Sequence, residues 1–75
     1  MSESKAEKTI LKSYVHYEDL DTLLEREDII VETTMNAINR ENEYNKDYTL
    51  KYLDSNILVR EDKFILEVLI EKINN

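Results

Sequence analysis

The stretch from residue 18 to residue 45, EDLDTLLEREDIIVETTMNAINRENEYN, decides how the rest of the chain is interpreted. On a helix with about 3.6 residues per turn, four acids recur at intervals of four, three and four and fall on one narrow face. These acids are Asp21, Glu25, Asp28 and Glu32. Apolar or small side chains gather on another face, with Glu27 intruding: Leu20, Leu23, Leu24, Val31, Thr34, Met35, Ala37 and Ile38. The stretch predicts a long amphipathic helix, either continuous or broken where Glu27 and Asp28 cap a second helix.

Negative charge is concentrated in this same region. The 75-residue chain has a net charge of −7. Residues 18–32 contain seven acids against Arg26 alone, which gives −6, whereas residues 1–17 contain three Lys against two Glu, which gives +1. Direct binding to nucleic acid is disfavoured, because such proteins need a basic footprint on the phosphates. A basic protein surface is the partner that this charge favours.

The length of the chain predicts a single domain over residues 1–75, with residues 1–3 disordered. Such a short chain buries only about 60% of its unfolded surface, and small proteins therefore often depend on disulfides, a metal or a partner subunit. The chain has no cysteine and one histidine, so neither a disulfide nor a zinc site is expected. Binding to a partner or to a second copy remains as the source of additional stability.

Two more helices are predicted on either side of this stretch. Ser4 and Glu7 match a capping box, which predicts a helix over residues 5–16. Residues 62–74 are apolar over more than half of a helical circumference, which predicts a buried helix. Residues 48–60 fit either a short helix or alternating strands, because both patterns match. The expected fold is an all-α bundle of three to four helices, and the alternative is an α+β fold with a small hairpin at about 48–60.

Residues that carry chemistry are scarce in this sequence. His16 is the only imidazole, and it has no acid at helical spacing within the predicted helix. Phosphate-cradling loops require glycine, and the chain has none. We therefore expect no enzyme activity, and no catalytic, cofactor-binding or metal-binding residues.

The leading functional hypothesis is a small acidic inhibitor or adaptor. Its predicted partner-binding residues are Asp21, Glu25, Asp28 and Glu32, which would contact a basic protein surface, in the manner of a nucleic-acid mimic if that surface normally binds nucleic acid. The alternative is a homo-oligomeric assembly module, a homodimer in the simplest case, held together by the apolar helix at 62–74. Its predicted interface residues are Leu66, Leu69, Ile70 and Ile73.

The location expected for the protein is the cytoplasm. The N-terminal sequence MSESKAEKT lacks an apolar signal region. The longest apolar runs are three residues, as in residues 57–59, so no membrane partner is expected.

Overall fold

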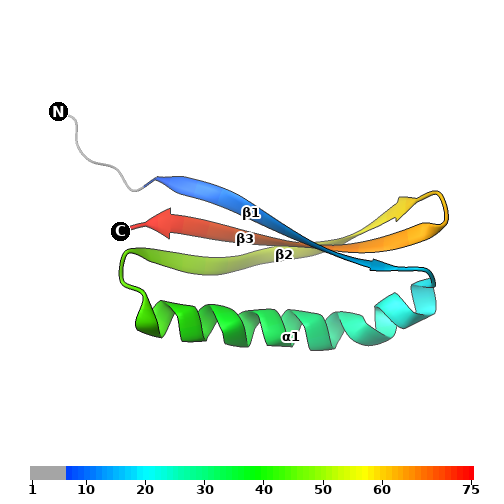
Figure 1. Cartoon of the computed structure of the whole chain (residues 1–75), viewed down its shortest axis with the longest axis horizontal. Helices are drawn as coiled ribbons and strands as arrows, with labels where there is room; N and C mark the ends of the chain where they lie inside the picture. Colours follow the sequence, from blue (N-terminus) through cyan, green and yellow to red (C-terminus); the bar gives the residue numbers. More distant parts are fainter. Residues whose placement is uncertain (1–6) are drawn as a thin grey trace.

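A computed structural model describes residues 7–75 of the chain. The elements follow the order β1 (Lys8–Tyr17), α1 (Leu20–Tyr44), β2 (Tyr48–Arg60) and β3 (Lys63–Asn74). The three strands form one antiparallel sheet in the order β1-β3-β2, and α1 lies along one face of it (Figure 1). The fold is α+β, so the prediction of an all-α helical bundle was wrong.

Helix α1 confirms the prediction of a long helix, and it is not broken at residues 27 and 28. Asp19 is its N-cap: the Asp19 carboxylate accepts hydrogen bonds from the Thr22 backbone N–H at 3.0 Å and from the Thr22 hydroxyl at 2.6 Å. The helix ends where the N–H of Asn45 donates to the carbonyl of Glu41 at 2.8 Å. Its N-cap and its amphipathic pattern over many turns both favour this element.

The two flanking segments predicted as helices are strands. Residues 8–17 form β1 and residues 63–74 form β3. Both are rich in β-branched and aromatic residues, which favour strands when neighbouring strands are present to pair with them. The predicted capping residue Ser4 and the predicted disorder at residues 1–3 lie outside the described residues.

Strands β2 and β3 form a long hairpin, which runs from green through yellow and orange to red in Figure 1. Arg60 pairs with Lys63, so the connection is the two-residue turn at residues 61 and 62. The chain has no glycine, and Glu61 adopts the left-handed conformation with φ of 48° that glycine usually supplies in such turns. Residues 48–60 thus form a single strand and not the small hairpin of the alternative prediction.

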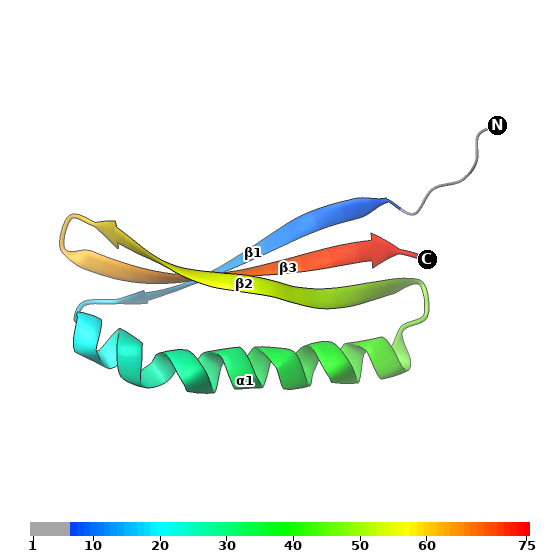
Figure 2. The ribbon, with the colours of Figure 1, turned by 180° about the vertical axis from the view of Figure 1, so that it is seen from behind.

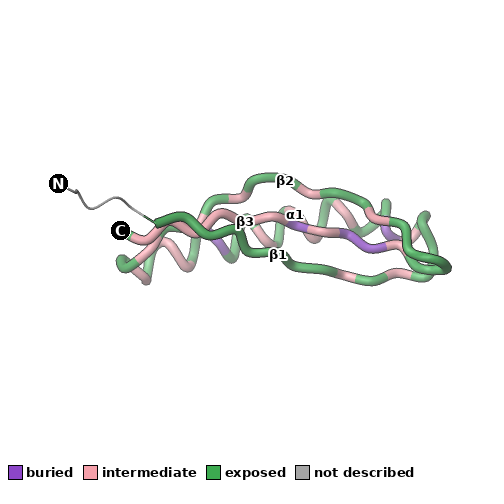
Figure 3. The backbone as a smooth tube through the Cα atoms, turned by 90° about the horizontal axis from the view of Figure 1, so that it is seen from above, coloured by how far each residue is buried: buried purple, intermediate pink, exposed green. Residues whose placement is uncertain are grey.

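The core lies between α1 and the central strand β3. Leu23 of α1 and Leu66 of β3 are fully buried, and Val68 is 1% exposed. Figure 3 shows that the buried residues are concentrated along β3 and on α1. Side chains alternate along a strand, so Ile65 and Leu69 fall on the opposite face of the sheet, which no described element covers (Figure 2).

None of the described residues belongs to a helix that is both long and apolar enough to cross a bilayer.

Candidate protein-interaction surface

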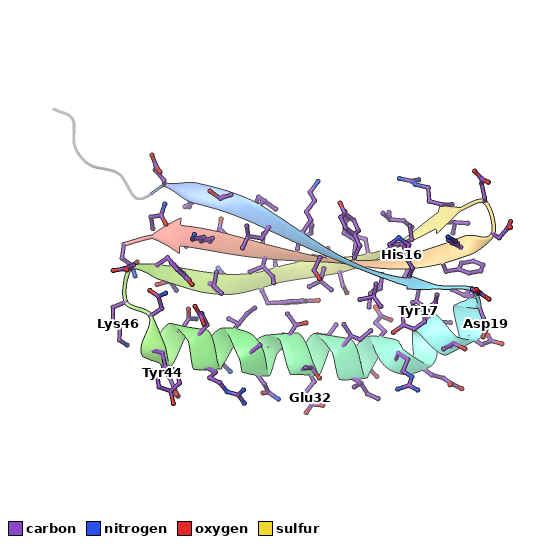
Figure 4. All side chains as sticks on the ribbon, in the orientation of Figure 1. His16, Tyr17, Asp19, Glu32, Tyr44 and Lys46 are labelled. Atoms are coloured by element: carbon purple, nitrogen blue, oxygen red, sulfur yellow. The ribbon has the colours of Figure 1, made fainter. Side chains whose placement is uncertain are left out.

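The four predicted partner-binding acids, Asp21, Glu25, Asp28 and Glu32, are all exposed on α1. At about 100° per residue they occupy one narrow stripe, roughly opposite the buried Leu23. In Figure 4 the Glu32 side chain points away from the sheet. We call these four residues the acidic stripe.

Few positive charges lie near the acidic stripe on the helix itself. Arg26 and Arg40 are the only basic residues of α1. Both lie roughly a quarter to a third of a turn around the helix from the stripe. Like charges at this spacing repel each other slightly, and the stripe gives α1 a strongly negative outer face.

Large apolar side chains border the acidic stripe on both sides. Leu24 is 49% exposed and Met35 is 42% exposed on one side, and Ile29 is 54% exposed on the other. An outer helix face that serves only to keep a protein in solution does not need exposed apolar side chains. Interfaces combine apolar contact area with charged groups around it, and this face of α1 has that composition.

The N-cap of α1 carries an ionisable group whose pKa is shifted. Hydrogen bonds from the Thr22 hydroxyl and the Thr22 backbone N–H lower the pKa of Asp19 below its usual value of 3.8. The ionised carboxylate also suits the positive end of the helix dipole. Asp19, two residues before the first acid of the acidic stripe, therefore helps to fix where the helix begins.

A cleft of about 450 Å³ opens on the side of α1 that faces β1. Ala37 and Ile38 of α1 line it together with Leu11 of β1 and Ile70 of β3. At its polar end the Tyr48 hydroxyl donates a hydrogen bond to the Glu41 carboxylate, which raises the pKa of Tyr48. The Lys72 ammonium lies 4.5 Å from the centre of the Tyr48 ring. The pattern along the sequence gave no signal for this cleft, because its walls come from four elements.

The residues predicted for an oligomer interface lie on two faces of β3. Leu66 is fully buried under α1, and Ile70 packs against the same core. By strand alternation Leu69 and Ile73 lie on the opposite face. Residues 63–74 form a strand and not a helix, so these four residues do not lie on one helix face. The predicted assembly through a C-terminal helix was therefore wrong.

His16 is exposed on the face of β1 that points away from α1 (Figure 4). Among residues 7–75, no cluster of three or more His, Cys, Asp or Glu is arranged to hold a metal ion. No protein-family model, curated protein or solved structure matches this chain.

Proposed function

We propose that this protein is a small inhibitor or adaptor that acts in the cytoplasm and binds a basic protein surface through the acidic stripe. The observation that carries the proposal is the juxtaposition on one helix face of four exposed carboxylates with exposed Leu24, Ile29 and Met35. Carboxylates provide long-range attraction and orientation, while apolar side chains provide contact area that excludes water.

The rigidity of α1 supports this role. The helix is capped by Asp19 and held on the sheet by buried Leu23 and Ile38, so its outer face is ordered before a partner arrives. A preorganised surface loses less conformational entropy on binding than a mobile one. Carboxylates at regular helical spacing can occupy the phosphate sites of a protein that normally binds nucleic acid.

The test compares two double charge reversals with equal changes in net charge. Glu25→Lys with Asp28→Lys alters the stripe, and Glu61→Lys with Asp62→Lys alters the exposed turn between β2 and β3. Partners are captured from an extract of the source cells with the unmodified protein, and the binding of each purified partner is then measured by calorimetry. We expect the stripe variant to bind at least about a hundredfold more weakly and the turn variant to bind almost normally.

The salt dependence of binding provides a second readout. If attraction between the stripe and a basic surface drives association, the association rate should fall steeply as salt rises towards 0.5 M. A partner that binds the stripe variant as tightly as the unmodified protein would show that the stripe is only a solvated surface.

A further inference from the structure

The two edges of the sheet differ in how their backbone hydrogen-bonding groups are satisfied. The order β1-β3-β2 places β1 and β2 at the edges. An edge strand presents alternate N–H and C=O groups that can pair with another chain, and proteins usually block such edges. Figure 3 shows β1 and β2 on opposite sides of β3.

The outer edge of β2 is blocked by the helix at Leu50. The Asn42 side chain accepts a hydrogen bond from the Leu50 N–H at 2.8 Å and donates one to the Leu50 carbonyl at 3.0 Å. This amide therefore occupies the position that a neighbouring strand would take. A β-bulge between Tyr52 and Asp54 further interrupts the regular edge.

The edge of β1 has no such protection among the described residues. The N–H of Asn74 donates to the carbonyl of Glu7 at 2.9 Å, so the backbone groups of Glu7 point towards β3. Odd-numbered residues of β1 therefore direct their backbone groups to β3, and even-numbered residues direct theirs outward. Residues 8–14 are all exposed, and no described strand pairs with this outer edge.

We propose that β1 pairs antiparallel with β1 of a second copy of this chain, about a twofold axis at Ser13. The result is a continuous six-stranded sheet with both helices on the same face. Such a contact is isologous: each copy uses the same surface. This inference does not depend on the proposed function.

The positions of the charged residues select this register. The backbone N–H and C=O groups of even-numbered β1 residues point to the open edge. Hydrogen bonds between two copies therefore form only in registers that pair even residues with even residues. Centring the contact on Lys12 places two lysines directly opposite each other, which is destabilising. Centring it on Leu11 or Tyr14 pairs only about seven residues of each copy, whereas centring it on Ser13 pairs about nine.

The Ser13 register also matches side chains across the contact. Lys12 lies opposite Tyr14 of the second copy, where the ammonium can rest on the aromatic ring. Leu11 lies opposite Val15 on the helix side of the sheet, beside the cleft lined by Leu11. Leu11 is 40% exposed in the single chain, and this pairing covers it with apolar surface.

Cysteine cross-linking tests both the contact and its register. The chain has no cysteine, so Ser13→Cys introduces a single thiol on the proposed axis. A non-hydrogen-bonded antiparallel pair has Cα atoms about 4.5 Å apart, within the range for a disulfide. Thr9→Cys is the matched control on the same strand and face, where the two thiols would be roughly 26 Å apart. We expect Ser13→Cys to form a covalent dimer at least about tenfold faster.

A proline at an outward-facing position tests the edge itself. Lys12→Pro removes only an N–H that points away from β3, so the fold of the single chain is retained while the ring obstructs pairing. Val59→Pro is the matched control, because Val59 is 60% exposed and occupies an equivalent position on the edge of β2. Circular dichroism checks that each variant is folded.

Sedimentation equilibrium should give twice the chain mass of 9.0 kDa for the unmodified protein and Val59→Pro, and the single mass for Lys12→Pro. A monomer at all concentrations up to about 100 μM overturns the proposal, as does a dimer that survives in folded Lys12→Pro. Equal cross-linking rates for Ser13→Cys and Thr9→Cys overturn the register even if Lys12→Pro is unfolded.

Discussion

The two ends of the interface between α1 and the sheet are held by different forces. Near the N-terminus of α1, Leu23 packs against Leu66 and Val68, and all three are almost completely buried. Near the C-terminus, Ile38 is the buried residue of the helix. There the Asn42 amide donates a hydrogen bond to the Leu50 carbonyl, and the Tyr48 hydroxyl donates one to the Glu41 carboxylate. These two bonds connect α1 to β2.

In this small domain, apolar burial and directional hydrogen bonds stabilise opposite ends of the same helix. Apolar burial is strong but has no preferred direction, so the packed end contributes most of the free energy of folding. Hydrogen bonds are weaker on balance but demand a fixed geometry, so the polar end sets the position of the helix over β2. The helix then lies away from β1, which leaves the cleft and the open edge of β1 on that side.

Truncation at the packed end should have the largest effect. Leu23→Ala removes the fully buried side chain and should cost about 3 kcal/mol, a large part of the stability expected of a 75-residue domain. Leu24→Ala is the matched control, because Leu24 is half exposed, and it should cost less than about 1 kcal/mol. Urea denaturation followed by circular dichroism measures both. Equal losses for the two variants would mean that the core is not where Leu23 and Leu66 meet.

Removal of the amide at the polar end should have an intermediate effect. Asn42→Ala deletes both hydrogen bonds to Leu50 and should cost about 1–2 kcal/mol. The Leu50 amide should then exchange its hydrogen at least about tenfold faster in NMR experiments, because it is no longer protected at the edge. Asn36→Ala, at an exposed position of the same helix, should change neither quantity. Unchanged exchange in Asn42→Ala would contradict the idea that this side chain blocks the edge of β2.

Loss of the N-cap should have the smallest effect, and one that depends on pH. The pKa of Asp19 is lowered in the folded protein, so its contribution is present above its ordinary pKa and is lost as pH falls through the folded value. Asp19→Ala should lower the Tm by about 5 °C at pH 7. The difference from the unmodified protein should shrink as the pH falls below 3.8, the usual pKa of the carboxyl group.

Asp21→Ala provides the control for this pH dependence, since Asp21 lies in the first turn of α1 and has the same charge. Its Tm should stay closer to that of the unmodified protein at both pH values. A constant difference between Asp19→Ala and the unmodified protein from pH 7 to pH 2.5 would show that the carboxylate does not act through its ionised form.

The candidate site was partly predictable because its pattern is local. The spacing of Asp21, Glu25, Asp28 and Glu32 placed them on one face of a helix, and the structure has that helix with all four exposed. The blocking role of Asn42 was not predictable, because its partner Leu50 is brought to it only by the fold.

The sequence by itself determined that an amphipathic helix follows residue 18 and that negative charge is concentrated on it. These features depend on residues a few positions apart, and the helical periodicity extends over many turns in this stretch. Only the tertiary structure decided that residues 8–17 and 63–74 are strands. A central strand is apolar on both faces, and over a short run that composition is indistinguishable from a helix buried on several sides. The pairing of β3 with strands on both sides, distant in sequence, resolves that ambiguity.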